Sequence, residues 1–325
     1  MNKNSIIFAI LALSFLAIGC SKTEKENNAE KDFVTVQLSV SAADAQGGTR
    51  SDMPLFPEQE NWIWDFYYVQ YDNMGRSAVS GHIRANATQG LLSVSENVLV
   101  RPAEETTILV VANIDPYNGN YGDLPVPSWQ VGDAIFIGGI ENEGFLSAAK
   151  VTKFDMTKRL TRDAEGHYST LKHMPMCGYW KGSIPEGTST STINIALGRM
   201  VARMNVNITN NSDYDVSEVT LNNVAKSAYV YPQASNTPLA AEDYLSSPVT
   251  QSVSIPHGTS KTLYFYTAPN YCDADHITSI QFRYGSKVSP AKQLGSYIVS
   301  ETEPEKNDYN LYMNTIYTYN IELTR

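Results

Sequence analysis

Residues 34–40 read VTVQLSV and alternate strictly between apolar and polar side chains. A period of two is typical of a half-buried β-strand, because successive side chains point to opposite faces of a sheet. The inward face of this strand would carry Val34, Val36, Leu38 and Val40. The end of the chain repeats the pattern in residues 317–323, where one face carries Tyr317, Tyr319, Ile321 and Leu323. Strands near both ends predict a β protein.

The sequence between these two segments has the same character. Residues 62–71 (WIWDFYYVQY) and 107–113 (TILVVAN) are aromatic or apolar on both faces, which predicts strands buried on both sides. Residues 200–208 alternate again, with Arg203 and Asn205 on the face opposite Met204 and Val206. Residues 146–150 are the one place where a short helical turn is expected. Turn-forming residues separate further alternating segments at 219–224, 250–255, 263–266 and 277–284.

Length and composition exclude several classes of protein. A chain of 325 residues is expected to form two domains, and its 42% hydrophobic residues exclude an intrinsically disordered chain. Acidic residues outnumber basic ones by 34 to 24, so nucleic acid is not expected as a partner. The composition change around residue 196 predicts an N-terminal domain over residues 33–196 and a C-terminal domain over residues 197–325.

The first residues carry a targeting signal. The apolar run at residues 6–18 is thirteen residues long, too short for a transmembrane helix but suited to a secretory signal. It ends in Leu-Ala-Ile-Gly-Cys at residues 16–20, which resembles a bacterial lipobox. We therefore expect residues 1–19 to be cleaved and Cys20 to carry a covalent lipid, followed by a flexible tether over residues 20–32. The alternative is an ordinary signal peptide with a chance cysteine.

No motif for catalysis, a metal or a cofactor is found in the sequence. G-x-S-x-G, H-E-x-x-H, P-loop and dinucleotide-binding patterns are missing, and the five histidines are scattered. We expect neither an enzyme nor a metal site. Cys177 and Cys272 are expected to be free thiols.

Several segments of the sequence form a recognisable set: the lipobox at Cys20, the first strand with its loop Gly48-Thr49-Arg50, the strand 108–113, Met174-Pro175-Met176-Cys177-Gly178, the stretch 197–203, Tyr264-Phe265-Tyr266 with Pro269-Asn270, and Asn314-Thr315-Ile316-Tyr317. Together they resemble the fimbrillin family of the Bacteroidales, the lipoprotein subunits of type V pili. Their order and spacing cover essentially the whole mature chain. The resemblance implies an all-β fold of two transthyretin-like β-sandwich domains.

The resemblance also implies a mechanism of assembly. In polymerising fimbrillins an arginine-specific protease cuts the loop after the first strand, and Arg50 with Ser51 occupies the matching position here. Cutting there would release the first strand together with the lipid anchor at Cys20. The open groove would then accept a donor strand from a neighbouring fimbrial subunit, for which residues 317–323 are the candidate. The protein would pass from a lipid-anchored precursor in the outer membrane to a cell-surface fimbria that supports adhesion.

Alternatives stay open at this stage. Arg50 could be an ordinary loop arginine, and the C-terminal strand could close its own sheet. Tip and anchor subunits share the architecture without polymerising in the same way. A surface lipoprotein that binds glycans on exposed aromatic residues is the alternative binding function, whereas Trp62, Trp64, Trp129 and Trp180 are expected to pack in the core. A secreted hydrolase built on β-sandwiches is the alternative enzyme.

Overall fold

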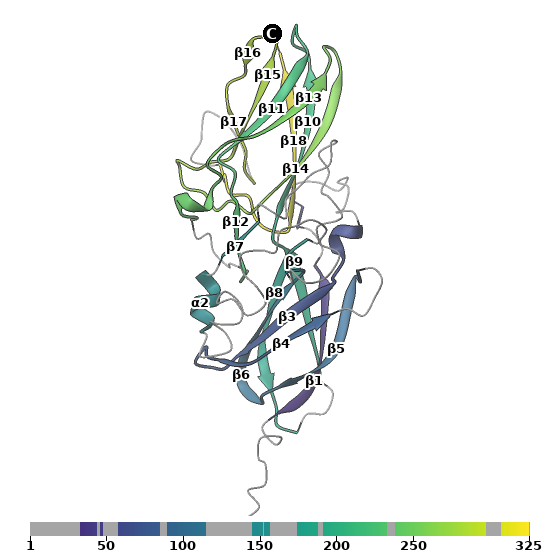
Figure 1. Cartoon of the computed structure of the whole chain (residues 1–325), viewed down its shortest axis with the longest axis vertical. Helices are drawn as coiled ribbons and strands as arrows, with labels where there is room; N and C mark the ends of the chain where they lie inside the picture. Colours follow the sequence, from purple (N-terminus) through teal and green to yellow (C-terminus); the bar gives the residue numbers. More distant parts are fainter. Residues whose placement is uncertain are drawn as a thin grey trace, which may run out of the picture.

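The computed structural model describes residues 33–43, 46–47, 58–84, 90–114, 145–151, 153–156, 174–187, 191–232, 238–296 and 307–324. Cys20, Arg50, Ser51 and Trp129 lie outside these ranges. The molecule is elongated, with the N-terminal strands in one half and the C-terminal strands in the other (Figure 1). It is built almost entirely of strands, so the expected all-β fold is confirmed.

The N-terminal half contains one seven-stranded sheet in the order β4-β3-β6-β8-β9-β1-β5. Its strands are β1 (Val34–Ala42), β3 (Asp65–Tyr71), β4 (Ser77–Arg84), β5 (Ser93–Val100), β6 (Ala103–Ala112), β8 (Met176–Ile184) and β9 (Thr192–Arg199). β8 and β9 pair at two positions only, Met176 with Arg199 and Cys177 with Gly198. The sheet therefore divides at this corner into two layers, β4-β3-β6-β8 and β9-β1-β5, which share one apolar core.

The C-terminal half is a second sandwich. One layer has the order β14-β10-β18-β2, formed by β14 (Ser260–Thr267), β10 (Ala202–Asn210), β18 (Thr315–Leu323) and the two-residue β2 (Gln46–Gly47). The other is formed by β13 (Val249–Ile255), β11 (Val216–Asn222), β15 (Ser279–Tyr284), β16 (Lys287–Val288) and β17 (Lys292–Gln293). Inward residues of β10, such as Met204 and Val206, meet Val219 and Phe282 in its core.

A third core joins the two sandwiches. In this core the outer face of β3 and β6 packs against four short elements or the residues beside them: the helix α2 (Leu146–Val151), the strands β7 (Lys153–Asp155) and β12 (Ser227–Tyr229), and η3 (Ala241–Asp243). The core also includes Tyr266 and Ile316 of the C-terminal sheet. Figure 1 shows α2, β7 and β12 at mid-height of the molecule. The predicted helical turn is thus confirmed as α2. None of the described helices is long and apolar enough to cross a bilayer.

The structure refines two expectations about the N-terminal half. The change from one sandwich to the other comes at residues 200–201, between β9 and β10, whereas the predicted boundary at residue 197 falls inside β9. The buried aromatic strand begins at Asp65, and Trp62 and Trp64 before it are half-buried. The reason is that β3 has a core on both faces, while the residues before it are outside the strand and pair through the isolated bridge between Ile63 and Leu91.

The polar face of residues 200–208 lies opposite the C-terminal core, as expected, but it is covered. Arg203 and Asn205 are buried, because the faces of Tyr264 and Tyr266 on the neighbouring β14 lie against the Arg203 guanidinium. Its carbon lies 5.1 Å and 5.7 Å from the two ring centroids, distances typical of cation–π contacts. The Arg203 Nε donates a hydrogen bond to Asn205 Oδ1 at 3.1 Å. Alternation alone cannot show that a polar face is covered by another part of the chain.

Candidate functional site

The first strand, β1, lies in the middle of its layer. It pairs antiparallel with β5 from Val34 opposite Val100 to Ser41 opposite Ser93, and parallel with β9 from Gln37 opposite Thr192 to Ala42 opposite Leu197. Both of its edges therefore carry main-chain hydrogen bonds. Without β1, β5 and β9 would each present an open edge, and the space between them would be one strand wide.

The inward side chains of β1 form part of the N-terminal core. Val36, Leu38 and Val40 are completely buried, and Val34 at the start of the strand is half-buried against the same core. At roughly 1.5 to 3 kcal/mol for each fully buried aliphatic side chain, these three residues contribute about 5 to 9 kcal/mol before main-chain hydrogen bonds are counted. The slot that β1 fills is consequently both apolar and lined by two strand edges.

The chain leaves β1 towards the C-terminal sandwich. The Ala43 N–H donates to the Leu197 carbonyl at 2.8 Å, and β2 then pairs in parallel with the first two residues of β18, Thr315 and Ile316. The predicted cleavage point between Arg50 and Ser51 comes shortly after, outside the described residues. The chain is described again from η1 (Glu58–Asn61), which lies at the junction of the two sandwiches.

A group of buried charged residues at this junction was not predicted. Glu60, Arg199 and Arg203 are exposed by only 2%, 2% and 4%. The Tyr266 hydroxyl donates to Glu60 Oε1. Burial raises the pKa of Glu60 to about 7, against the lowering effects of that hydrogen bond and of the two arginines. The available sequence signal was the pair of arginines four residues apart in an otherwise apolar stretch; nothing in the sequence connected them to Glu60.

The C-terminal strand β18 occupies its own sheet in this structure. All nine of its residues, from Thr315 to Leu323, pair in parallel with β10. Tyr317, Ile321 and Leu323 are buried in the C-terminal core, and the half-buried Tyr319 packs against it and donates from its hydroxyl to the Gly295 carbonyl at 2.8 Å. On the other edge, among the described residues, only Thr315 and Ile316 have a strand partner.

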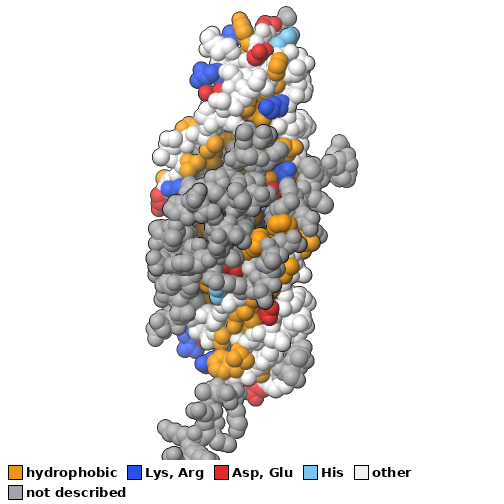
Figure 2. All heavy atoms as spheres, turned by 45° about the vertical axis from the view of Figure 1, so that its right-hand side comes forward, with side chains coloured by type: hydrophobic (Ala, Val, Ile, Leu, Met, Phe, Trp, Pro, Cys, Tyr) orange, Lys and Arg blue, Asp and Glu red, His pale blue; other side chains and the backbone are white. Residues whose placement is uncertain are grey.

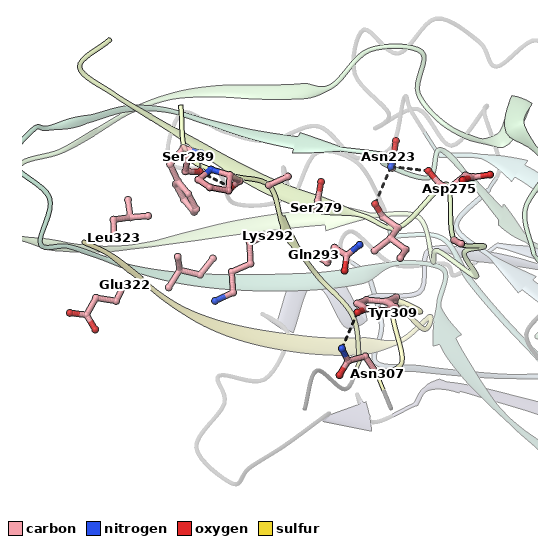
Figure 3. Close-up of a pocket in the computed structure, with 16 residues that line it drawn as sticks. Asn223, Asp275, Ser279, Ser289, Lys292, Gln293, Asn307, Tyr309, Glu322 and Leu323 are labelled. Atoms are coloured by element: carbon pink, nitrogen blue, oxygen red, sulfur yellow. Dashed lines mark hydrogen bonds between the residues drawn. The ribbon is translucent and has the colours of Figure 1, made fainter. Parts of the chain in front are cut away.

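A groove runs beside that open edge of β18. It has a volume of about 640 Å³ and lies between the two layers of the C-terminal sandwich. Figure 3 shows Lys292 and Gln293 of β17 in the middle of the lining residues, with Leu323 and Glu322 of β18 at one end. Buried Phe282 adds an apolar surface to the lining. Among the described residues that edge of β18 beyond Ile316 has no strand partner, and the groove combines apolar surface with this strand edge.

Metal-ligating side chains do not gather in the part of the chain that the structure describes. Within this part no group of three or more His, Cys, Asp or Glu side chains is placed to hold a metal ion. Cys177 is buried and Cys272 half-buried, and both are free thiols. Figure 2 shows apolar side chains at the surface of both halves, interspersed with polar and charged ones. The most distinctive features of the described residues are a strand in the middle of its layer and a sheet edge with few strand partners.

Comparison with known proteins identifies solved structures that share this architecture. No protein-family model and no curated protein matches the chain. Solved structures do match: the tip fimbrial protein Mfa3 of Porphyromonas gingivalis, in a C-terminally truncated form, aligns with a TM-score of 0.58 and 14% identity over 90% of this chain and 96% of that one. The chain has the fold of the Bacteroidales fimbrial proteins. A candidate cell adhesion protein from Parabacteroides distasonis aligns with a TM-score of 0.57 and 14% identity over 90% of this chain and 88% of that one.

A second candidate adhesion protein from Parabacteroides distasonis aligns with a TM-score of 0.52 and 11% identity over 90% of this chain and 92% of the other. The fimbrial fold expected from the sequence is thereby confirmed. These matches cover both sandwiches, so the likeness concerns the whole two-sandwich arrangement and not a single β-sandwich domain.

Proposed function

We propose that the chain is a structural subunit of a cell-surface fimbria and that it assembles after proteolytic removal of β1. The observation that carries this proposal is the place of β1 between β5 and β9, with three fully buried aliphatic side chains. A strand in the middle of a layer leaves a complete slot when it departs. An extended segment of a neighbouring subunit restores both rows of main-chain hydrogen bonds and refills the apolar positions. Such head-to-tail contacts do not close on themselves and produce a filament.

Processing at Arg50 fits this arrangement. A cut after Arg50 leaves β1 and the proposed lipid on Cys20 on the same fragment, so departure of β1 also frees the body of the protein from the outer membrane. Before the cut, the lipid holds the precursor there. The partners implied are an arginine-specific protease, the outer membrane and other fimbrial subunits.

The place of β18 supports a second candidate, a tip subunit. A stem subunit must accept one donor strand and supply another, whereas a tip subunit only accepts. The candidate donor residues Tyr317, Ile321 and Leu323 are buried in their own core, and donation would break the pairing of β18 with β10. A subunit that keeps β18 in its own sheet and accepts a strand in the β1 slot fits the tip position.

The test uses the mature chain and a matched Arg50→Ala variant. Limited digestion with an arginine-specific protease is followed by N-terminal sequencing, size-exclusion chromatography and electron microscopy. We expect a new N-terminus at Ser51 in the natural chain only, together with loss of the β1 fragment and a ladder of oligomers. A chain that is fully cut at Arg50 yet stays monomeric, with no complex formed on mixing with uncut protein, would contradict the proposal.

A further inference from the structure

One buried guanidinium contacts three separate parts of the chain. Arg199 is the last residue of β9, and its Nη1 donates to the Ala43 carbonyl at 3.0 Å and to Asn314 Oδ1 at 2.6 Å. Its Nη2 donates to Asn61 Oδ1. Ala43 directly follows β1, Asn61 ends η1, and Asn314 directly precedes β18. The guanidinium thus connects the chain on both sides of residues 44–57 with the start of the C-terminal strand.

The contact with Asn314 is reciprocal. The Asn314 N–H donates to the carbonyls of Arg199 at 2.9 Å and of Val201 at 2.8 Å, and the Arg199 N–H donates to Asn314 Oδ1 at 3.2 Å. Asn314 has a φ of 55°, a left-handed conformation that asparagine tolerates better than most residues. The first residue of β18, Thr315, is therefore preceded by a fixed corner that depends on Arg199.

Burial makes these contacts interdependent. A guanidinium that is 2% exposed depends on protein acceptors for its hydrogen bonds, and its planar fork fixes where those acceptors lie. Removing one acceptor leaves a buried donor without that partner, at a cost in free energy that a shift of the remaining contacts would reduce. Among the three acceptors, only the Ala43 carbonyl belongs to the segment that leaves with β1.

We propose that Arg199 is a positioning residue that couples the departure of β1 to the start of β18. The inference rests on the proposed function, since it concerns the effect of β1 departure on the rest of the chain. A cut after Arg50 takes away the Ala43 carbonyl and also β2, which pairs with Thr315 and Ile316. The corner at Asn314 and the first two residues of β18 lose support in the same event. Emptying the N-terminal slot therefore loosens the beginning of β18 and opens its edge.

Hydrogen exchange tests this coupling on the full mature chain. Exchange is measured in the uncut protein, after cutting with β1 still bound, and after β1 has been stripped with mild denaturant and removed. Stripping is expected to raise exchange of residues 314–317 about tenfold, which corresponds to roughly 1.4 kcal/mol of lost local protection. Residues 219–221 of β11, which contact neither Arg199 nor β2, serve as the internal reference.

Hydrogen exchange of the β5 and β9 amides distinguishes a failure of the proposed function from a failure of the coupling. They report the departure of β1, because β1 pairs with both strands. If β1 cannot be cut away and these amides stay protected, the proposed function fails. If they become exposed while residues 314–317 exchange as before, the coupling is wrong and the proposed function stands.

Two variants test the role of Arg199 without a protease. Asn314→Gly removes the side-chain acceptor while glycine keeps the left-handed backbone, and Arg199→Lys keeps the charge but loses the fork. Both are expected to raise exchange at Ala43 and at residues 315–316 together, while the reference residues 219–221 stay protected. Arg283→Lys, at a surface arginine whose side chain is 47% exposed, is the control. Unchanged exchange at Ala43 in Asn314→Gly would overturn the inference.

Discussion

Val40 of β1 and Ile195 of β9 lie opposite each other on neighbouring parallel strands, and both side chains are buried in the N-terminal core. Parallel strands need a long connection between them, and here more than 140 residues separate the two partners. β1 is consequently joined to β9 by pairing and packing and not by a short turn. Under the proposed function, a cut in the chain after β1 would leave this strand held by pairing and packing alone.

The inward face of β1 should control how firmly it is held. Leu38→Ala removes a fully buried side chain and is expected to destabilise the protein by roughly 2 to 5 kcal/mol, the usual range for such core substitutions. After cutting, β1 should also dissociate faster from this variant. Urea unfolding and the rate of fragment release measure the two effects. The control is Gln37→Ala on the exposed face of the same strand; equal effects from both substitutions would show that the slot does not hold β1 by its apolar face.

The sequence was sufficient to predict the strands at both ends, because their alternation matches one buried and one exposed face. It also predicted the buried β6 and the helical turn of α2. It could not show that β18 pairs in parallel with β10, since alternation does not reveal a strand's neighbours. Nor could it place Glu60 beside Arg203, because the contact depends on how the segment after β1 crosses the junction between the sandwiches.

The candidate site likewise contains residues that could be predicted from the sequence and residues that could not. The inward residues of β1 could be found from local periodicity, and the structure buries Val36, Leu38 and Val40 completely. Arg199 could not be assigned a role from the sequence. Its three acceptors, Ala43, Asn61 and Asn314, are separated from it by up to 156 positions and meet only in the folded chain.

The junction should make stability depend on pH through Glu60. Its folded-state pKa of about 7 lies above the ordinary value of 4.5, so the folded protein binds the proton more tightly than the unfolded chain. The contribution of the protonated acid is fully present below about pH 4.5 and is lost as the pH rises through 7, by roughly 3 kcal/mol in total. Tyr266, Arg199 and Arg203 are the ionisable groups that act on it.

Glu60→Gln tests this dependence because glutamine keeps an acceptor for the Tyr266 hydroxyl but does not titrate. Relative to the natural chain, the variant should gain stability as the pH is raised from 5 to 8. Urea unfolding at several pH values measures the difference, with Glu96→Gln, at an exposed residue of β5, as the control. A difference that is the same at every pH would show that Glu60 does not titrate in this range.

The two described thiols should differ in reactivity. Burial raises the pKa of Cys177 far above its usual range and that of Cys272 to about 11. Only the thiolate reacts with iodoacetamide, and Cys177 is 1% exposed in the core that joins the sandwiches. In native protein at pH 8, alkylation should therefore be slow at Cys272 and undetectable at Cys177, as measured by peptide mass spectrometry.

The same labelling shows whether the junction stays closed when β1 leaves. Cys177 belongs to the joining core and not to the core that contains β1, so stripping β1 should leave it protected. Denaturant should expose both thiols equally, and a Cys272→Ser variant confirms the assignment of the peptides. Rapid alkylation of Cys177 in the stripped protein would mean that loss of β1 opens the β8–β9 corner itself.

Whether β18 is donated can be decided by fixing it to β10. Asn207 and Asn320 are register partners on these two strands, and the Asn207 Nδ2 donates to Asn320 Oδ1 at 2.8 Å near the surface. Neighbouring strands lie about 4.8 Å apart, within the range of Cα separations that a disulfide spans. A chain with Asn207→Cys and Asn320→Cys can therefore be oxidised to hold β18 in its own sheet and reduced to free it.

The locked chain separates a stem subunit from a tip subunit. If the protein is a stem subunit that donates β18, the oxidised form should stay monomeric after cutting at Arg50, and reduction should restore the ladder of oligomers. The single variant Asn207→Cys should assemble under both conditions. If the oxidised form assembles as well as the reduced one, a segment other than β18 fills the slot. A third outcome is that the cut chain binds one natural subunit but forms no longer oligomer in either redox state. It then acts as an acceptor only, because β18 would lose more contacts on leaving β10 than it would gain in the β1 slot of a neighbour.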